Sequence, residues 1–442
     1  MKRIHLLIAL ISTMPNYAMA DISFSWHGAS PAQAKIINIP APKSSGIDCG
    51  INVAYGTDGL RMRYDTTSSL ADVKWYRFSG MGAAYADEIA SSGKDSTASW
   101  IDNPQGDTGY IIEDGDKRLY IWLTDYSRHP LSLGELSAQA GHDCGNMNLK
   151  CTGKGDEIHY YSITGRRMTL SRDMSLTYTS LIWDDAQKSF AESPVTSTLD
   201  HLSPTLHVEA PLCATSFTLT GDRFLREWGC EQTYISPTFQ PHSILAHTQA
   251  IQSTRYNDNE ISGPQNGTTL GGSAPCTVKF IADVTDAAVF HEWQFSRHRD
   301  FEDIIFRASE TELTHTFTEH GSIYVRLYCA NDDASCEYFG ETYEIFTGAS
   351  SLKCPNAFSP LNMDGVNDVW KVSYSSIIDF ECHIFNRHGT KIVSMTDPSQ
   401  GWDGKHGGKY VPAGAYFYTI RALGADGKRY ELSGDINIVE YR

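Results

Sequence analysis

The chain has 442 residues, which corresponds to about three domains, or four if they are small and rich in β-strands, so a single hydrophobic core is excluded. Lys and Arg total 36 against 53 Asp and Glu, and the formal net charge of −17 argues against nucleic acid as a partner. Hydrophobic residues make up 41% and aromatic residues 11%, which excludes a wholly disordered chain.

The first twenty residues have the features of a secretory signal peptide. Lys2 and Arg3 precede an apolar run from Leu6 to Met14, and Ala18 and Ala20 are small residues at the positions that a signal peptidase reads. The run is too short to span a bilayer, and no later stretch is long enough to do so. We therefore expect residues 1–20 to be removed, leaving an exported chain without a transmembrane helix and with a charge of −19, from 34 basic and 53 acidic residues.

Ten cysteines follow the predicted cleavage site, and an even number in an exported chain favours disulfides. No CxxC pair or Cys/His cluster at ligand spacing indicates a metal. Spacing does not determine the connectivity, because ten cysteines allow roughly nine hundred pairings. The working hypothesis pairs near neighbours: Cys144 with Cys151, Cys213 with Cys230, Cys329 with Cys336, and Cys354 with Cys382.

Short period-2 segments bounded by turn residues run through the chain, for example around Met62, Trp75, Trp122 and Val325. Long amphipathic helical patterns are missing from the sequence. The spacing predicts an all-β protein made of tandem immunoglobulin-like β-sandwich modules.

A weak internal repeat supports this prediction, because three times a Cys opens a strand-like run and a Trp follows after a further strand. The three pairs are Cys49 with Trp75, Cys151 with Trp183, and Cys276 with Trp293. A central Trp packed between two sheets is typical of such sandwiches. We expect modules at residues 21–145, 146–235, 275–349 and 353–442, and at 236–274 the last strand of the second module followed by a linker.

The third module resembles PKD-type domains. VKFIADVTDAAVFHEWQFS, followed by THTFTEHGSIYVRLYCAND, combines a central Trp strand, a T-F-x-x-x-G turn and a Tyr-x-Val-like strand. Such domains are extracellular spacers or binding modules, so the resemblance implies architecture rather than chemistry.

The last ninety residues, 353–442, alternate polar turns and strand-like runs. Asn, Asp and Gly fill the segment 362–368, where their side chains can cap their own backbone. Two further Gly-rich turns follow, one of which contains Trp402 as a large apolar plug, and Asp426 with Gly427 has the chemistry of a hairpin turn. A compact seven-strand sandwich is the expected result.

This stretch strongly resembles the gliding-motility-associated C-terminal domain, the type B sorting domain of the type IX secretion system of Bacteroidetes. The matching pieces are CPNAFSP, GVNDVW, ECHIFNRHGTKI, PSQGWDGKHGGKYVPAGAYFY and ADGKRYELSGDINI, in family order. The motif residues that we expect to matter for sorting are Pro355, Asn356, Phe358, Gly365, Asn367, Asp368, Asn386, Arg387, Gly389, Gly401, Trp402, Asp403, Gly404, Gly414 and Gly434. Two departures are His388, where the family usually has Trp, and LNMDG, where the turn is often NGDG.

The resemblance implies a route and a set of partners. The chain would enter the periplasm by Sec export, fold there, and cross the outer membrane to the cell surface or the medium. Its partners would be the type IX translocon and its outer-membrane cargo receptor. The segment 353–442 holds ten basic and ten acidic residues, so the whole negative charge of the mature chain lies in the preceding modules. The sequence identifies no surface ligand.

Catalytic motifs are missing from the sequence: it has no HExxH, GxSxG, Walker loop or GxGxxG. The nearest clusters are His291 with Glu292, the SRHRD segment around His298, and Glu113 with Asp114 in an expected hairpin turn. We interpret all three as strand, loop or turn residues, and we expect no cofactor.

Three further patterns have competing interpretations. Asn362, Asp364 and Asp368 could bind Ca²⁺, but the Gly and Glu of an EF-hand are missing and an Asx turn is favoured. Trp402 could stack on a sugar, but a core position is favoured. The triplets at 65–67 and 95–97 resemble a bacterial O-glycosylation signal, although triplets of this kind arise by chance.

The sequence thus favours a non-enzymatic surface or secreted protein, delivered by the type IX system. Two alternatives remain open. One is a dedicated component or signalling partner of the secretion apparatus. The other is a secreted hydrolase with its active site in residues 21–235.

Overall fold

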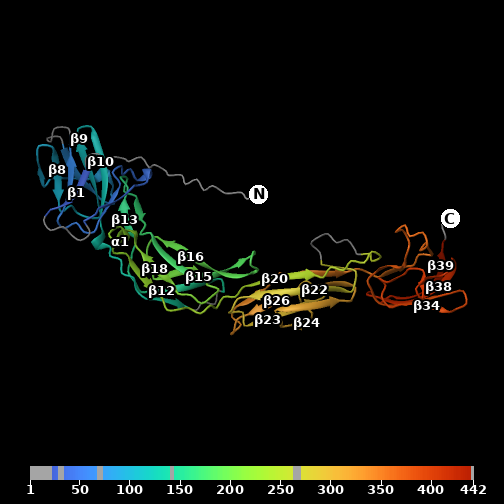
Figure 1. Cartoon of the computed structure of the whole chain (residues 1–442). Coiled ribbons are helices and arrows are strands. Elements are labelled where there is room, and N and C mark those ends of the chain that lie inside the picture. Colours follow the sequence, from blue (N-terminus) through green and yellow to red (C-terminus); the bar gives the residue numbers. More distant parts are fainter. Residues whose placement is uncertain (1–21, 28–33, 67–72, 140–143, 262–269, 440–442) are drawn as a thin grey trace.

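The computed structural model describes residues 22–27, 34–66, 73–139, 144–261 and 270–439. The predicted signal peptide and Thr67 of the first glycosylation triplet lie outside them. Four β-rich modules follow one another in a bent row, from the blue N-terminal module to the red C-terminal one (Figure 1). Within the described part of the chain no helix has the length and hydropathy of a membrane span. The predicted all-β tandem sandwich architecture is confirmed.

The first module is a sandwich of a four-stranded and a six-stranded sheet, in the orders β1-β4-β8-β7 and β2-β3-β10-β9-β5-β6. Its strands are β1 (Ile22–Trp26), β2 (Ile37–Ile39), β3 (Ile51–Ala54), β4 (Leu60–Asp65), β5 (Val73–Phe78), β6 (Asp87–Ile89), β7 (Gly93–Lys94), β8 (Ala98–Asp102), β9 (Thr108–Asp114) and β10 (Lys117–Asp125). Trp75 is buried between the two sheets, as the repeat predicts.

The six-stranded sheet is buried on both faces. On β10, Ile121 and Leu123 face the core of the first module, whereas Trp122 points the other way and packs against Phe78 and Tyr160, with ring centroids 6.0 and 6.4 Å apart. Continuous apolar runs in β9 and β10, rather than strict alternation, are the sequence signature of such a doubly covered sheet. The first two modules therefore share a hydrophobic core.

The second module contains sheets in the orders β11-β12-β17, β13-β14 and β16-β15-β18-β19. Its elements are β11 (Leu136–Gln139), β12 (Asn146–Cys151), β13 (Ile158–Tyr161), β14 (Arg167–Leu170), β15 (Met174–Asp184), β16 (Ser189–Leu199), β17 (Thr205–Glu209), β18 (Thr218–Gly221), α1 (Arg223–Glu227) and β19 (Gln232–Ile235). Since β11 pairs with β12, the second module begins before the expected boundary at residue 146.

The Cys–Trp repeat fails in the second module. Trp183 lies at the far end of the long β15–β16 hairpin and is only half-buried. Its ring stacks on His247 of the third module at a centroid distance of 3.6 Å. Trp183 therefore belongs to the contact between the second and third modules and not to the core of the second module.

The third module pairs sheets in the orders β20-β22-β25 and β21-β28-β26-β23-β24, with β27 added beside β26. Its strands are β20 (Ala246–Gln252), β21 (Leu270–Gly272), β22 (Cys276–Val284), β23 (Phe290–Ser296), β24 (Ile304–Ala308), β25 (Glu312–Phe317), β26 (Gly321–Ala330), β27 (Glu337–Phe339) and β28 (Tyr343–Thr347). Trp293 is fully buried between its sheets. β20 pairs with β22, so the strand expected at the end of the second module is in fact the first strand of the third.

The C-terminal module has its own hydrophobic core and one five-stranded sheet in the order β30-β39-β38-β33-β34. The opposite layer is divided into the pairs β29-β32, β31-β35 and β36-β37. The strands are β29 (Ser351–Lys353), β30 (Ala357–Phe358), β31 (Trp370–Lys371), β32 (Ser373–Ser375), β33 (Ile377–Phe385), β34 (Lys391–Met395), β35 (Gly401–Trp402), β36 (Lys405–His406), β37 (Lys409–Tyr410), β38 (Gly414–Gly424) and β39 (Arg429–Ile438).

Candidate sorting domain

Two tryptophans and a phenylalanine anchor the C-terminal sandwich. Trp370, Trp402 and Phe358 are almost fully buried, and the Trp402 ring lies 5.2 Å from the rings of both Phe358 and Tyr416. The indole nitrogen of Trp370 donates to the carbonyl of Pro355 at 2.7 Å, and that of Trp402 donates to the carbonyl of Lys405 at 3.0 Å. Trp402 thus occupies the core position that the sequence favoured, and it is not available to stack on a sugar.

The glycine of the G-W-D-G turn is required by geometry. Gly404 has a φ of +76°, and a Cβ added there would lie 2.7 Å from Cγ of Pro360. A side chain would therefore be strained by its backbone conformation and would also collide with a buried proline. The turn can seat Trp402 in the core only with glycine at this position.

The polar loop at 362–368 is held by its own side chains. Asp364 accepts a hydrogen bond from the Asn362 amide at 2.9 Å and one from the backbone N–H of Val366 at 2.8 Å. Asp368 accepts from the backbone N–H of Gly365 at 2.9 Å. The bond from Val366 to Asp364 is that of an Asx turn, the interpretation favoured over calcium, and the other two bonds brace the same loop.

The hairpin at 386–390 is closed in the same way. Asn386 Oδ1 accepts from the backbone N–H groups of His388 and Thr390, at 2.9 and 3.0 Å. Arg387 and His388 point into solvent at the tip. Among the motif residues, the exposed ones are Pro355, Asn356, Gly365, Asn367, Arg387, Gly389, Gly401, Asp403 and Gly414. Phe358, Trp402 and Gly404 are buried, and Asp368, Asn386 and Gly434 are partly buried. The motif thus includes buried residues that form the sandwich and exposed residues that a partner can contact.

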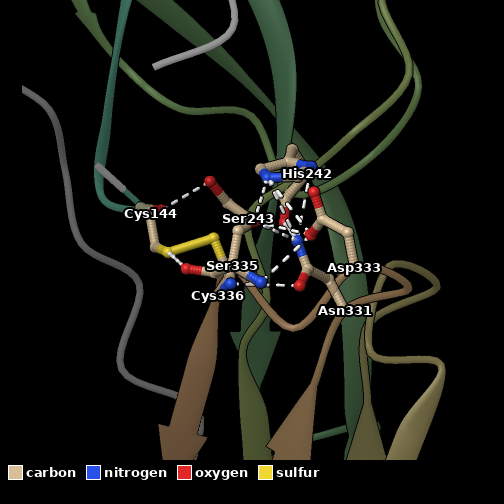
Figure 2. The surroundings of a disulfide bond; sticks show 7 residues. All are labelled: Cys144, His242, Ser243, Asn331, Asp333, Ser335 and Cys336. Atoms are coloured by element: carbon tan, nitrogen blue, oxygen red, sulfur yellow. Dashed lines mark hydrogen bonds and ion pairs between the residues drawn. A yellow bond between two sulfur atoms is a disulfide. The ribbon is translucent and has the colours of Figure 1, made fainter. Parts of the chain in front are cut away.

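A disulfide upstream joins the second and third modules. Cys144 and Cys336 are bonded across 192 residues of sequence, with their Cα atoms 5.5 Å apart. Figure 2 shows the surrounding network, in which Ser243 donates to the Cys144 carbonyl at 2.5 Å and His242 Nε2 lies 2.6 Å from Ser335 Oγ. The predicted pairs Cys144–Cys151 and Cys329–Cys336 are therefore wrong. Cys213 and Cys354 also lack the predicted disulfides.

The same network brings together a serine, a histidine and an aspartate. Ser335 Oγ donates to Asp333 Oδ1 at 2.6 Å, whereas His242 Nε2 is 4.0 Å from that oxygen. In a catalytic triad the carboxylate orients the imidazole, but here it binds the serine hydroxyl directly. The pKa of Asp333 lies below its ordinary value because the Ser335 hydroxyl and N–H stabilise the carboxylate. The contacts among these three residues therefore differ from those of a catalytic triad.

Histidine–carboxylate pairs also occur within residues 21–235. His129 Nε2 lies 3.0 Å from Asp107 Oδ1, and Glu157 lies 3.4 Å from His159 and 3.7 Å from His201. Burial, aided by the charge of Arg167, lowers the pKa of His159.

The other residues singled out from the sequence have structural partners. Glu292 contacts Arg307 and accepts from Gln294, and Asp114 accepts from Tyr64 and Thr66. His298 donates its backbone N–H to the hydroxyl of Ser296 at 2.9 Å. These contacts give Glu292, Asp114 and His298 partners within their own modules.

The two glycosylation triplets differ in exposure. The Thr66 hydroxyl is buried against Asp114, whereas Ser96 and Thr97 are exposed in a turn capped by Asp95. The N–H of Thr97, helped by Arg63, lowers the pKa of Asp95 to about 2. Among the described triplet residues, Ser96 and Thr97 present their hydroxyls to solvent and Thr66 does not.

A buried ion pair within the second module, which Tyr126 of the first module also contacts, has no sequence signal. Arg172 and Asp222 are both fully buried and 2.6 Å apart, and the Tyr126 hydroxyl donates to the same carboxylate oxygen at 2.9 Å. Arg172 also donates to the carbonyls of His129 and Asp156. Burial and the neighbouring Asp222 raise the pKa of Tyr126. A lone Arg between Ser and Asp could not be distinguished from a surface residue without the fold.

Comparisons with known proteins identify two of the modules. The fold defines a tandem β-sandwich protein, in which residues 137–236 match the family model of the fibronectin type III domain. Residues 352–438 match the CHU_C Type IX secretion signal domain, which confirms the resemblance found in the sequence. Such a signal indicates export to the cell surface or the extracellular space and implies contact with the secretion apparatus.

Two of the solved structures that resemble the chain share 10% identity with it. One is the crystal structure of a tetra-tandem repeat in the extending region of a large adhesion protein, with a TM-score of 0.22 over 87% of this chain and 97% of that chain. The other is dimeric latent PorU from Porphyromonas gingivalis, with a TM-score of 0.16 over 74% of this chain and 36% of that chain. No curated protein matches the chain in sequence.

Proposed function

We propose that the chain passes through the periplasm, is delivered by the type IX secretion system through residues 353–442, and acts outside as a non-enzymatic binding or structural protein. The match of residues 352–438 to the secretion signal domain is the observation that carries this proposal. The separate core of the C-terminal sandwich supports it, because a recognition module must fold as a unit. Its balanced charge supports it further, since the acidic surface belongs to the modules that it delivers.

The test is fractionation of two strains, one with the full chain and one lacking residues 353–442. The full chain should appear at the surface or in the medium, and the truncated chain should accumulate in the periplasm. A matched control is the exposed Ser96→Ala variant, which alters one of the upstream modules and should be delivered normally. Normal surface delivery of the truncated chain would refute the assignment.

A deletion strain and two histidine variants separate the alternatives. A component of the secretion apparatus would be required by other cargo, so a strain without this chain would retain unrelated type IX cargo in the periplasm. A hydrolase would lose turnover of a substrate panel when His159 or His201 beside Glu157 is replaced by alanine. We expect neither effect.

A further inference from the structure

A short segment between β20 and β21 of the third module lies against the C-terminal sandwich. Residues 255–261, called the strap here, follow β20 and run beside β32. The backbone N–H of Tyr374 donates to the carbonyl of Asn259 at 3.1 Å, and that of Ile261 donates to the carbonyl of Tyr374 at 2.7 Å. Because the other edge of β32 pairs with β29, the strap acts as a third strand of this layer.

Side chains of the strap reinforce the pairing. Asn259 donates to the carbonyls of Val372 and Pro398, both at 2.8 Å, which links two loops of the C-terminal sandwich. Asn257 donates to the Tyr374 hydroxyl at 2.9 Å. Asp258 pairs with Lys371 at 2.7 Å. Three consecutive side chains are therefore committed to the neighbouring module.

The strap is also fastened to its own module. Arg255 donates to the carbonyl of Pro275 at 2.9 Å and pairs with Glu260, whose side chain is only 6% exposed. Burial raises the pKa of Glu260, but hydrogen bonds from Arg255, Ser273 and Asn257 outweigh burial and leave it below the ordinary value. Burial and the Glu260 charge raise the pKa of Tyr374 to about 12.

Further contacts join the same two modules elsewhere. The N–H of Ser376 donates to the Ser273 hydroxyl at 2.8 Å, and the N–H of Ala274 donates to the Ser376 hydroxyl at 3.1 Å. The N–H of His320 donates to the carbonyl of Ala425 at 3.0 Å. Contacts on several sides hold the C-terminal sandwich in one orientation.

We propose that the strap is a working part of the sorting unit, which orients the C-terminal sandwich for the export apparatus, so that delivery depends on residues 255–261 as well as on 353–442. This inference rests on the proposed function. The export apparatus should bind the C-terminal sandwich best when the sandwich is already held in one orientation. If the sandwich moves freely relative to the third module, only the fraction of molecules in the right orientation can bind, and the apparent affinity falls by that fraction. The strap also covers the edge of β32, and an uncovered strand edge invites pairing with other chains.

The test uses the full chain with the double change Asn257→Ala and Asn259→Ala. Loss of four side-chain hydrogen bonds, three of them to the C-terminal sandwich, should speed hydrogen exchange at the amides of Ile261 and Tyr374 by about tenfold or more. The delivered fraction should fall by at least about threefold, with the rest in the periplasm. The control is Tyr256→Ala, which lies in the strap but is 91% exposed and should behave as the unaltered chain.

Unchanged hydrogen exchange at the amides of Ile261 and Tyr374 in the double variant would overturn the proposal, because the strap would then not hold the sandwich. Faster exchange with normal delivery would overturn it as well. If the double variant fails to fold, Asp258→Ala, which removes only the ion pair with Lys371, gives the same two measurements. Retention of the chain lacking 353–442, together with normal delivery of the strap variants, would refute this inference and leave the proposed function intact.

Discussion

The disulfide between Cys144 and Cys336 provides the most direct test of how the modules are joined. It closes a separation of 192 residues, for which the chain-entropy estimate is an upper limit of about 5 kcal/mol at 25 °C. Replacing both cysteines by alanine should therefore lower the free energy of unfolding by about 3–5 kcal/mol. Each single replacement should cost nearly as much, because either one removes the bond.

The assay combines urea unfolding with mass-spectrometric mapping of the unreduced chain. Mapping should recover one cross-linked peptide that contains Cys144 and Cys336, and the double variant should unfold at lower urea. Conversion of Cys213 to alanine is the control, since that thiol forms no disulfide and the unfolding midpoint should change little. Recovery of Cys144 linked to Cys151, or an unchanged midpoint in the double variant, would refute the reasoning.

Three further predictions concern buried and interfacial charges and the C-terminal core. Arg172→Met should lower the free energy of unfolding by about 3–5 kcal/mol, because it leaves Asp222 buried without its cation, and Asp222→Asn added to it should recover part of the loss in urea unfolding. Trp370→Ala should cost the C-terminal sandwich about 3–5 kcal/mol through the cavity that it leaves, with a lower melting temperature and no effect on the first module. The pKa values of Glu260 and Asp258 lie below their ordinary values, so both carboxylates stabilise the docked strap above about pH 4 and this stabilisation is lost as the pH falls further. Limited proteolysis at pH 5 and pH 3 should show cleavage within 255–261 only at the lower pH, and equal cleavage at both would contradict the prediction.

Local chemistry made the C-terminal domain predictable from the sequence. Its turns depend on Asx hydrogen bonds to Asp364 and Asn386, on the bond from the Gly365 N–H to Asp368, and on the left-handed conformation of Gly404. All the residues that form such a turn lie within a few positions of one another in the sequence, and the core position of Trp402 follows from its place in one of these turns. Strand content in the other modules was predictable for the same reason, because alternation is a local property.

The junctions were not predictable, because their partners are far apart in sequence. The sequence of β20 does not show to which module the strand belongs, and only its pairing with β22 assigns it to the third module. Trp183 has the spacing of a core residue, yet its strand extends past its own sandwich. The bond between Cys144 and Cys336 contradicts the near-neighbour hypothesis because the distance between cysteines in the fold is unrelated to their spacing in the chain. The strap at 255–261 lies in a polar stretch with the consecutive turn formers Asn257, Asp258 and Asn259, a pattern that predicts a linker.

Each junction between successive modules is held by a different kind of contact. The first two modules share a hydrophobic core with the buried pair Arg172–Asp222, the next two are joined by the disulfide, and the last two are joined by the strap. Ordinary domain linkers leave neighbouring modules free to rotate. Here rotation at any junction would expose apolar surface, break a covalent bond or unpair a strand. The chain therefore behaves as one continuous bent row (Figure 1), and a partner that grips the C-terminal sandwich also sets the direction in which the upstream modules are presented.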